Sequence, residues 1–213
     1  MHHMSMIRLR TLFTGVFLAL LALSVGATPT WAQGQSTQAD IRQMLEERDQ
    51  EIKSILEGGD NDYTAQQRER LKELINGVID FRAMAQTALG THWDTLSTDR
   101  REAFVDVFRD VVRAQSMSDL DVYNSRVTFD QITVQGDSAF VRTTTEYQGT
   151  RTPVEYVLER RDSSWVAEDI IVDQVSTAEG YARSFQSVVR KRGFAVLMKS
   201  LERKRDEIMA KSS

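Results

Sequence analysis

The chain has 213 residues, and its 27 basic and 31 acidic side chains give a formal net charge of −4. This acidic balance argues against nucleic acid as a partner. The sequence contains no cysteine, so we expect no disulfide framework, no lipid-modified cysteine and no thiolate metal site.

The first 32 residues have the pattern of a cleavable export signal. Arg8 and Arg10 precede an apolar run over residues 12–25, and small residues lead up to Ala32. The run is shorter than the roughly 20 residues that a membrane-spanning helix needs. We therefore expect residues 1–32 to be a signal peptide, cleaved after Ala32, and the mature protein to lie in the periplasm.

The rest of the chain shows no sequence pattern that would divide it into separate domains. Residues 33–39 are polar and small, which predicts a short flexible lead. Residues 40–213 carry only one proline and no linker-like stretch, and they are numerous enough to bury a core. We expect residues 40–213 to form a single domain.

Helical patterns fill the first half of this domain. Apolar residues from Ile41 to Ile55 recur at spacings of three, four and seven and predict a helix that ends at Gly58. Thr64 and Gln67 have the spacing of a capping box, which predicts a second helix ending near Asp80.

Two more helices follow in the pattern. Residues 81–89 predict a short helix closed by a left-handed Gly90. Ser97 is expected to cap another helix, whose apolar stripe includes Phe104 and Phe108.

From Val127 the apolar period changes to two and β-branched residues become frequent, which predicts strands. Four segments separated by short turns, at 127–134, 138–147, 154–160 and 165–172, read as an antiparallel meander. Two further helices are expected, at 177–193 and 194–209. Helices, then strands, then helices indicate an α+β fold in which a four-stranded antiparallel sheet packs against a helical layer.

The sequence offers little catalytic chemistry. His92 is the one histidine after residue 32, and no nucleophile motif, phosphate-binding glycine loop or regular metal-ligand spacing is present. We expect no catalytic residue, no metal and no cofactor, and we expect that the chain is not an enzyme.

A resemblance to a known family carries the functional prediction. The stretch VIDFRAMA at 78–85, with ALG at 88–90 and Trp93, resembles the signature of the MlaC (toluene-tolerance) family of periplasmic phospholipid-binding proteins. The stretch TPVEYVL at 152–158 is similar to the family's third-strand pattern. In order along the chain, the matching pieces extend roughly from Ile41 to Lys204.

The resemblance implies a soluble, monomeric carrier with a phospholipid as its cargo. It also implies two partners, an outer-membrane lipoprotein complex and an inner-membrane ABC transporter with its lipid-binding subunit, and a role in maintaining outer-membrane lipid asymmetry. The acyl chains would lie in a dry apolar cavity between the sheet and the helices.

We expect this cavity to be lined by bulky apolar side chains from both layers. Periodicity puts Val154 with Tyr156 on one face of the sheet and Ala167 with Ile171 on another, and it leaves open which face meets the cavity. The expected lining residues are Phe81, Met84, Phe104, Phe108, Val154, Tyr156, Ile171, Tyr181 and Phe185.

Two other functions fit the same fold class. The first is a small α+β enzyme of the cone-shaped NTF2-like kind, which would need acid or base groups inside its pocket. The second is a periplasmic interaction or chaperone-like module with a filled core and no ligand. Bound lipid would distinguish the carrier from both.

Overall fold

The computed structural model describes residues 30–57 and 63–211. Most of the expected signal peptide, residues 1–29, therefore lies outside the described residues. Helix α1 already includes residues 33–39, so the segment expected to be a flexible lead is helical here. Among the described residues, no helix has both the length and the hydropathy to cross a membrane.

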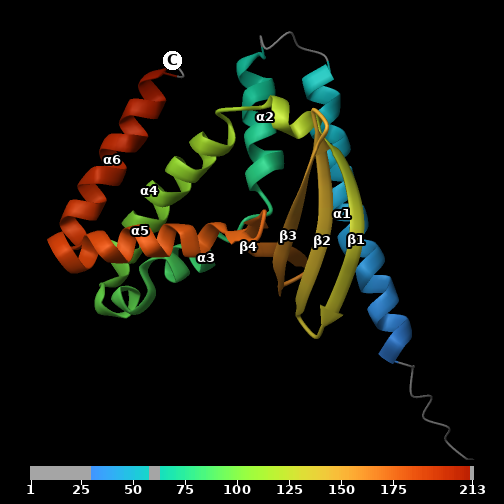
Figure 1. Ribbon diagram of the computed structural model, residues 1–213. Coiled ribbons are helices and arrows are strands. Elements are labelled where there is room, and N and C mark those ends of the chain that lie inside the picture. Colours follow the sequence, from blue (N-terminus) through green and yellow to red (C-terminus); the bar gives the residue numbers. More distant parts are fainter. Residues whose placement is uncertain (1–29, 58–62, 212–213) are drawn as a thin grey trace, which may run out of the picture.

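The elements follow one another as helices, then strands, then helices (Figure 1). In chain order they are α1 (Thr30–Glu57), α2 (Ala65–Asn76), α3 (Phe81–Leu89), the short 3₁₀ helix η1 (Gly90–Thr95), α4 (Thr98–Ser116), the 3₁₀ helix η2 (Asp121–Asn124), β1 (Arg126–Gln135), β2 (Ser138–Tyr147), β3 (Thr150–Arg161), β4 (Ser164–Val172), β5 (Val175–Ser176), α5 (Thr177–Arg192) and α6 (Phe194–Lys211).

The helix ends show how far local patterns decide this part of the fold. Both capping-box bonds at Thr64 are present, because its hydroxyl accepts from the Gln67 N–H and its own N–H donates to the Gln67 side chain. Gly90 closes α3 with φ of +56°, as expected. Ser97 stands before α4 but makes no side-chain cap bond, and α2 ends at Asn76, earlier than expected.

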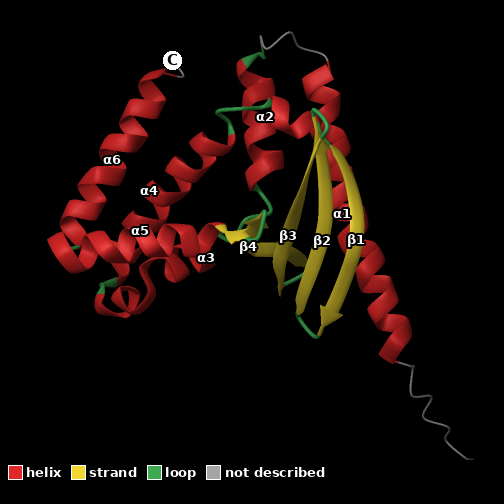
Figure 2. Ribbon diagram, in the orientation of Figure 1, coloured by secondary structure: helices red, strands yellow, loops and turns green. Residues whose placement is uncertain are grey.

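The sheet is an antiparallel meander in the order β1-β2-β3-β4-β5 (Figure 2). The sequence predicted four strands, and the structure adds a fifth of two residues. Asp173 and Gln174 take φ of +49° and +65°, which turns the chain back so that β5 pairs with the end of β4. The α+β fold is therefore as predicted, with the strand count corrected to five.

Two irregularities in the sheet break the strict alternation of faces. The register shifts at Asp130 in β1 and at Glu168 in β4, where one strand carries an extra residue. Beyond Glu168 the faces are exchanged, so Ile170 pairs with Tyr156 and Ile171 pairs with Glu155. Because paired residues point to the same face, Ile171 lies on the face opposite Tyr156.

The buried apolar side chains form three clusters. Helices α3, α4, α5 and α6 lie together on the β4 side of the sheet and form the helical cluster, while α1 runs along the sheet (Figure 1). The sheet cluster joins Ile41 of α1 to one face of the sheet, which we call the inner face and which carries Val141 and Leu158. The α1–α2 cluster joins Ile52 and Leu56 to Leu71 and Leu74.

Candidate functional site

The helical cluster is built on aromatic rings spaced four residues apart on two helices. Phe104 and Phe108 of α4 stack with ring centroids 5.8 Å apart, and both side chains are fully buried. Tyr181 and Phe185 of α5 meet them edge to face, with centroids of Tyr181 and Phe108 5.0 Å apart. Such pairs add to the stabilisation that burial provides.

Helix α3 completes this cluster. Phe81 and Met84 project from it into the same group of side chains, and both are buried. The structure thus brings together all six helical residues that the sequence predicted for the cavity. In this structure they pack against one another, and their role as the lining of a cavity stays a prediction.

The sheet residues predicted for the cavity divide between two faces. Every second residue of β3 points to the same side, so Val154 and Tyr156 lie on the inner face together with the buried Leu158. Tyr156 packs against the sheet cluster. Ile171 lies on the opposite face and does not join them. The extra residue Glu168 causes this difference, since period-two counting assumes an unbroken strand.

One short segment connects the helical cluster to the sheet cluster. Ile79 packs against both clusters. Its neighbours bind β4 through the backbone, because the Asp80 N–H donates to the Ala167 carbonyl at 2.8 Å and the Ala167 N–H donates to the Val78 carbonyl at 2.6 Å. The two halves of the predicted lining therefore meet at Ile79.

A group of polar side chains lies beside the α1–α2 cluster, and no sequence pattern predicted it. We call Asn76, Ser116 and Tyr123 the polar node. The fully buried Asn76 accepts a hydrogen bond of 2.9 Å from the Ser116 hydroxyl, and the Tyr123 hydroxyl donates to the Ser116 carbonyl at 3.2 Å. These residues come from α2, α4 and η2, so no local sequence pattern relates them.

Tyrosines connect this node to the sheet. Burial raises the pKa of Tyr123 to about 12, and the neighbouring Tyr156 adds to the effect. Burial also raises the pKa of Tyr156 to about 12, with a smaller effect from the Asp49 carboxylate of α1. Both phenols therefore stay neutral at physiological pH.

Arg113 lies between the polar node and the helical cluster. It belongs to the last turn of α4, one turn before Ser116, and its guanidinium carbon lies 5.4 Å from the centroid of the Phe81 ring. Its Nε is buried and has no hydrogen-bond partner among the described residues. Buried donors are nearly always paired, so this one requires an explanation.

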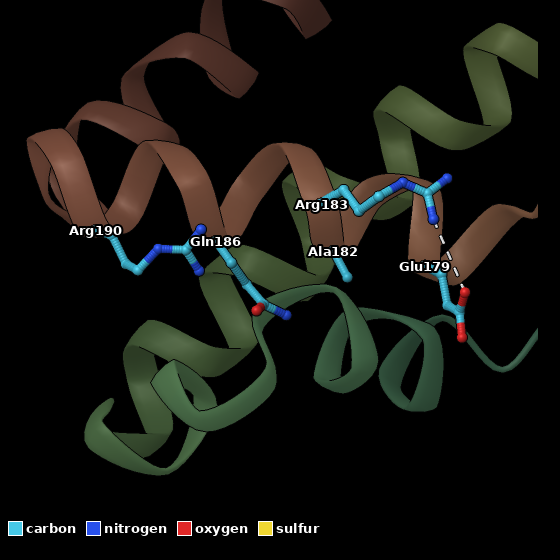
Figure 3. Close-up of a pocket in the computed structure, with 5 residues that line it drawn as sticks. All are labelled: Glu179, Ala182, Arg183, Gln186 and Arg190. Atoms are coloured by element: carbon cyan, nitrogen blue, oxygen red, sulfur yellow. Dashed lines mark ion pairs between the residues drawn. The ribbon is translucent and has the colours of Figure 1, made fainter.

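The hollows at the surface are polar and lie elsewhere. One of about 350 Å³ runs along α5 and is lined by Glu179, Ala182, Arg183, Gln186 and Arg190 (Figure 3). Another, of about 380 Å³, lies between α1 and α2 beside Arg48 and Arg70. Neither hollow is the apolar cavity expected between sheet and helices, so that cavity stays a prediction.

A metal ion would need a group of side chains among the described residues that could bind it. Within residues 30–57 and 63–211, no group of three or more His, Cys, Asp or Glu side chains is arranged to hold a metal ion. His92, the one histidine of this region, lies in η1 and is half-buried. What the arrangement offers is a large apolar surface in two halves, with polar groups at their junction.

Comparison with known proteins identifies the family. The family model described as "MlaC protein" matches residues 46–203, which is more than half of the chain. The chain belongs to the MlaC family. The matched span contains every residue predicted for the cavity and also Arg113, so the resemblance inferred from the sequence is confirmed.

A solved structure supports the MlaC fold. The phospholipid-binding protein from Ralstonia solanacearum, whose structure was determined in complex with a phospholipid, is 22% identical to this chain. The match has a TM-score of 0.67 and covers 81% of this chain and 98% of the other. Nothing among the curated proteins matches this chain.

Proposed function

We propose that this protein is a soluble periplasmic carrier that binds a phospholipid by its acyl chains. In this proposal it carries the lipid between an outer-membrane lipoprotein complex and the lipid-binding subunit of an inner-membrane ABC transporter, and thereby maintains outer-membrane lipid asymmetry. Membership of the MlaC family is the observation that carries the proposal. The phospholipid complex of the Ralstonia protein supports it further.

Elementary energetics explain why lipid transfer needs a carrier. At about 0.8 kcal/mol per methylene, exposing one 16-carbon chain to water costs roughly 12 kcal/mol, so a lipid leaves a bilayer very slowly by itself. A protein that keeps the chains dry lowers this barrier and makes or breaks no covalent bond. The proposed role is therefore binding and transport, not catalysis.

The proposed binding mode separates the two apolar halves at Ile79. The acyl chains would enter between the helical cluster and the inner face of the sheet, and would replace contacts that these side chains now make with one another. Exchange of one apolar contact for another changes the free energy little, which suits a reversible carrier. Direction of transport would depend on the relative affinities of the two partner complexes.

The closed packing of Phe104 and Phe108 favours one competing function. A periplasmic interaction module with a filled core would have the same closed cluster and would bind no lipid. Vesicle assays separate the two, because only a carrier moves lipid between membranes.

The experiment measures transfer of a fluorescent phosphatidylethanolamine from donor to acceptor vesicles. We expect the transfer rate to increase with the concentration of the wild-type protein. Val154→Glu, on the inner face, should lower the rate at least about tenfold, because a carboxylate in a dry cavity is strongly unfavourable. Ile171→Glu adds the same charge on the opposite face and should leave the rate nearly unchanged.

Thermal unfolding of both variants provides the folding control, and Val154→Thr replaces V154E if that variant does not fold. A wild-type protein that leaves the transfer rate at its protein-free value would refute the carrier. Equal effects of V154E and I171E would refute the assignment of the inner face.

A further inference from the structure

Arg113 has a buried donor that the folded chain does not use. The guanidinium lies over the Phe81 ring, and its Nε is without a hydrogen-bond partner in the described part of the chain. By contrast Arg109, one turn earlier on α4, donates to Asp106 at 2.7 Å and lies 4.0 Å from Asp110. A buried unpaired donor costs free energy unless a partner arrives.

The position of Arg113 in the last turn of α4 accounts for a positive charge there, because the carbonyl end of a helix favours cations. It does not account for the buried, unpaired Nε or for the contact of the guanidinium with the Phe81 ring. An arginine that served only the helix end would have its nitrogens in water or on the terminal carbonyls.

The side chains near Arg113 are of the kinds expected where a lipid headgroup binds. On one side is Phe81 of the helical cluster, and one turn further along α4 is Ser116 of the polar node. Tyr123 of this node lies close enough to Tyr156, on the sheet's inner face, for Tyr156 to contribute to the raised pKa of Tyr123. Arg113 thus contacts the helical cluster and lies one helical turn from the polar node.

We propose that Arg113 binds the phosphate of the lipid headgroup. A planar guanidinium presents N–H groups in a fork that matches two phosphate oxygens, and the unpartnered Nε supplies one of them. The acyl chains then extend from Arg113 between the helical cluster and the inner face. This inference rests on the proposed lipid-binding function and names the group that selects a phospholipid over a neutral lipid.

The experiment compares two lipids with identical chains. Delipidated protein is incubated with 1-palmitoyl-2-oleoyl-phosphatidylglycerol or with 1-palmitoyl-2-oleoylglycerol in detergent micelles, and native mass spectrometry measures the occupied fraction. We expect the wild-type protein to prefer the phospholipid. Arg113→Gln should reduce this preference about tenfold or more, because a charge-assisted bidentate contact is lost.

Three controls isolate the effect. Arg113→Lys keeps the charge but lacks the fork and should retain part of the preference. Arg109→Gln removes an arginine from the same helix and should leave the preference unchanged. Lipid-free R113Q loses the contact with the Phe81 ring and a positive charge at the end of α4, so its unfolding temperature should fall by about 5 °C or less and the variant should stay folded in the binding assay.

The possible outcomes are distinct. A preference that R113Q retains in full overturns the role of Arg113 and leaves the carrier intact. A calorimetric signal with inorganic phosphate alone that R113Q abolishes, together with an unchanged lipid preference, would mean that the site takes free phosphate and would overturn the headgroup assignment. Failure of the wild-type protein to bind either lipid overturns the proposed function itself.

Discussion

At the scale of single residues, two half-buried tyrosines should make the stability of the protein depend on pH under alkaline conditions. Tyr123 and Tyr156 have pKa values raised to about 12, against about 10 in an unfolded chain. Below pH 10 both states hold the phenolic protons, and stability is unaffected. Between about pH 10 and 12 the unfolded chain loses these protons first, so stability falls as pH rises.

We therefore predict that Tyr156→Phe makes the free energy of unfolding less dependent on pH in this range. The difference from the wild type should reach up to about 1.4 kcal/mol per pH unit, since one tyrosine no longer contributes. Urea unfolding at pH 8 provides the baseline for each protein, and repeats between pH 10 and 11 give the slope. Parallel curves for the two proteins would show that Tyr156 ionises equally in both states.

At the scale of elements, a residue at a helix cap should stabilise the helix only if its side chain makes a cap hydrogen bond. Thr64→Ala removes the hydroxyl that accepts from the Gln67 N–H at the start of α2 and should cost about 1 kcal/mol of unfolding free energy. Ser97→Ala should cost only a few tenths, since Ser97 makes no side-chain cap bond. Urea unfolding measures both, and equal losses would contradict this account of the caps.

The same scale shows what the sequence could predict. Helix α3 and strand β2 were predicted with their observed bounds, because apolar spacing, turn residues and Gly90 act within a few positions. The six aromatic and Met residues of the helical cluster were found from their spacing, although spacing could not tell whether they line an open cavity or pack together.

What the sequence could not predict depends on contacts between distant segments. The extra residue Glu168 moved Ile171 to the other face, and only the pairing of β3 with β4 reveals it. The polar node is assembled from α2, α4 and η2, so Asn76 and Ser116 gave no signal on their own. Likewise, Arg113 looked like any basic residue near a helix end.

At the scale of the whole molecule, the buried core is divided into three clusters, and the proposed lipid binding depends on this division. A domain of this size usually has one contiguous core. Here Ile79 packs against both the helical cluster and the sheet cluster, and Tyr123 of the polar node packs against the α1–α2 cluster. The proposed binding mode requires the helical cluster and the sheet cluster to separate while the contacts within each cluster are kept.

Native mass spectrometry of the protein purified under mild conditions tests the central claim most directly. A lipid carrier should give a main species heavier than the chain by the mass of one phospholipid, and denaturing extraction of the same sample should release that lipid. A bare chain in the native spectrum, with no lipid in the extract, would contradict the carrier and favour a module with a filled core.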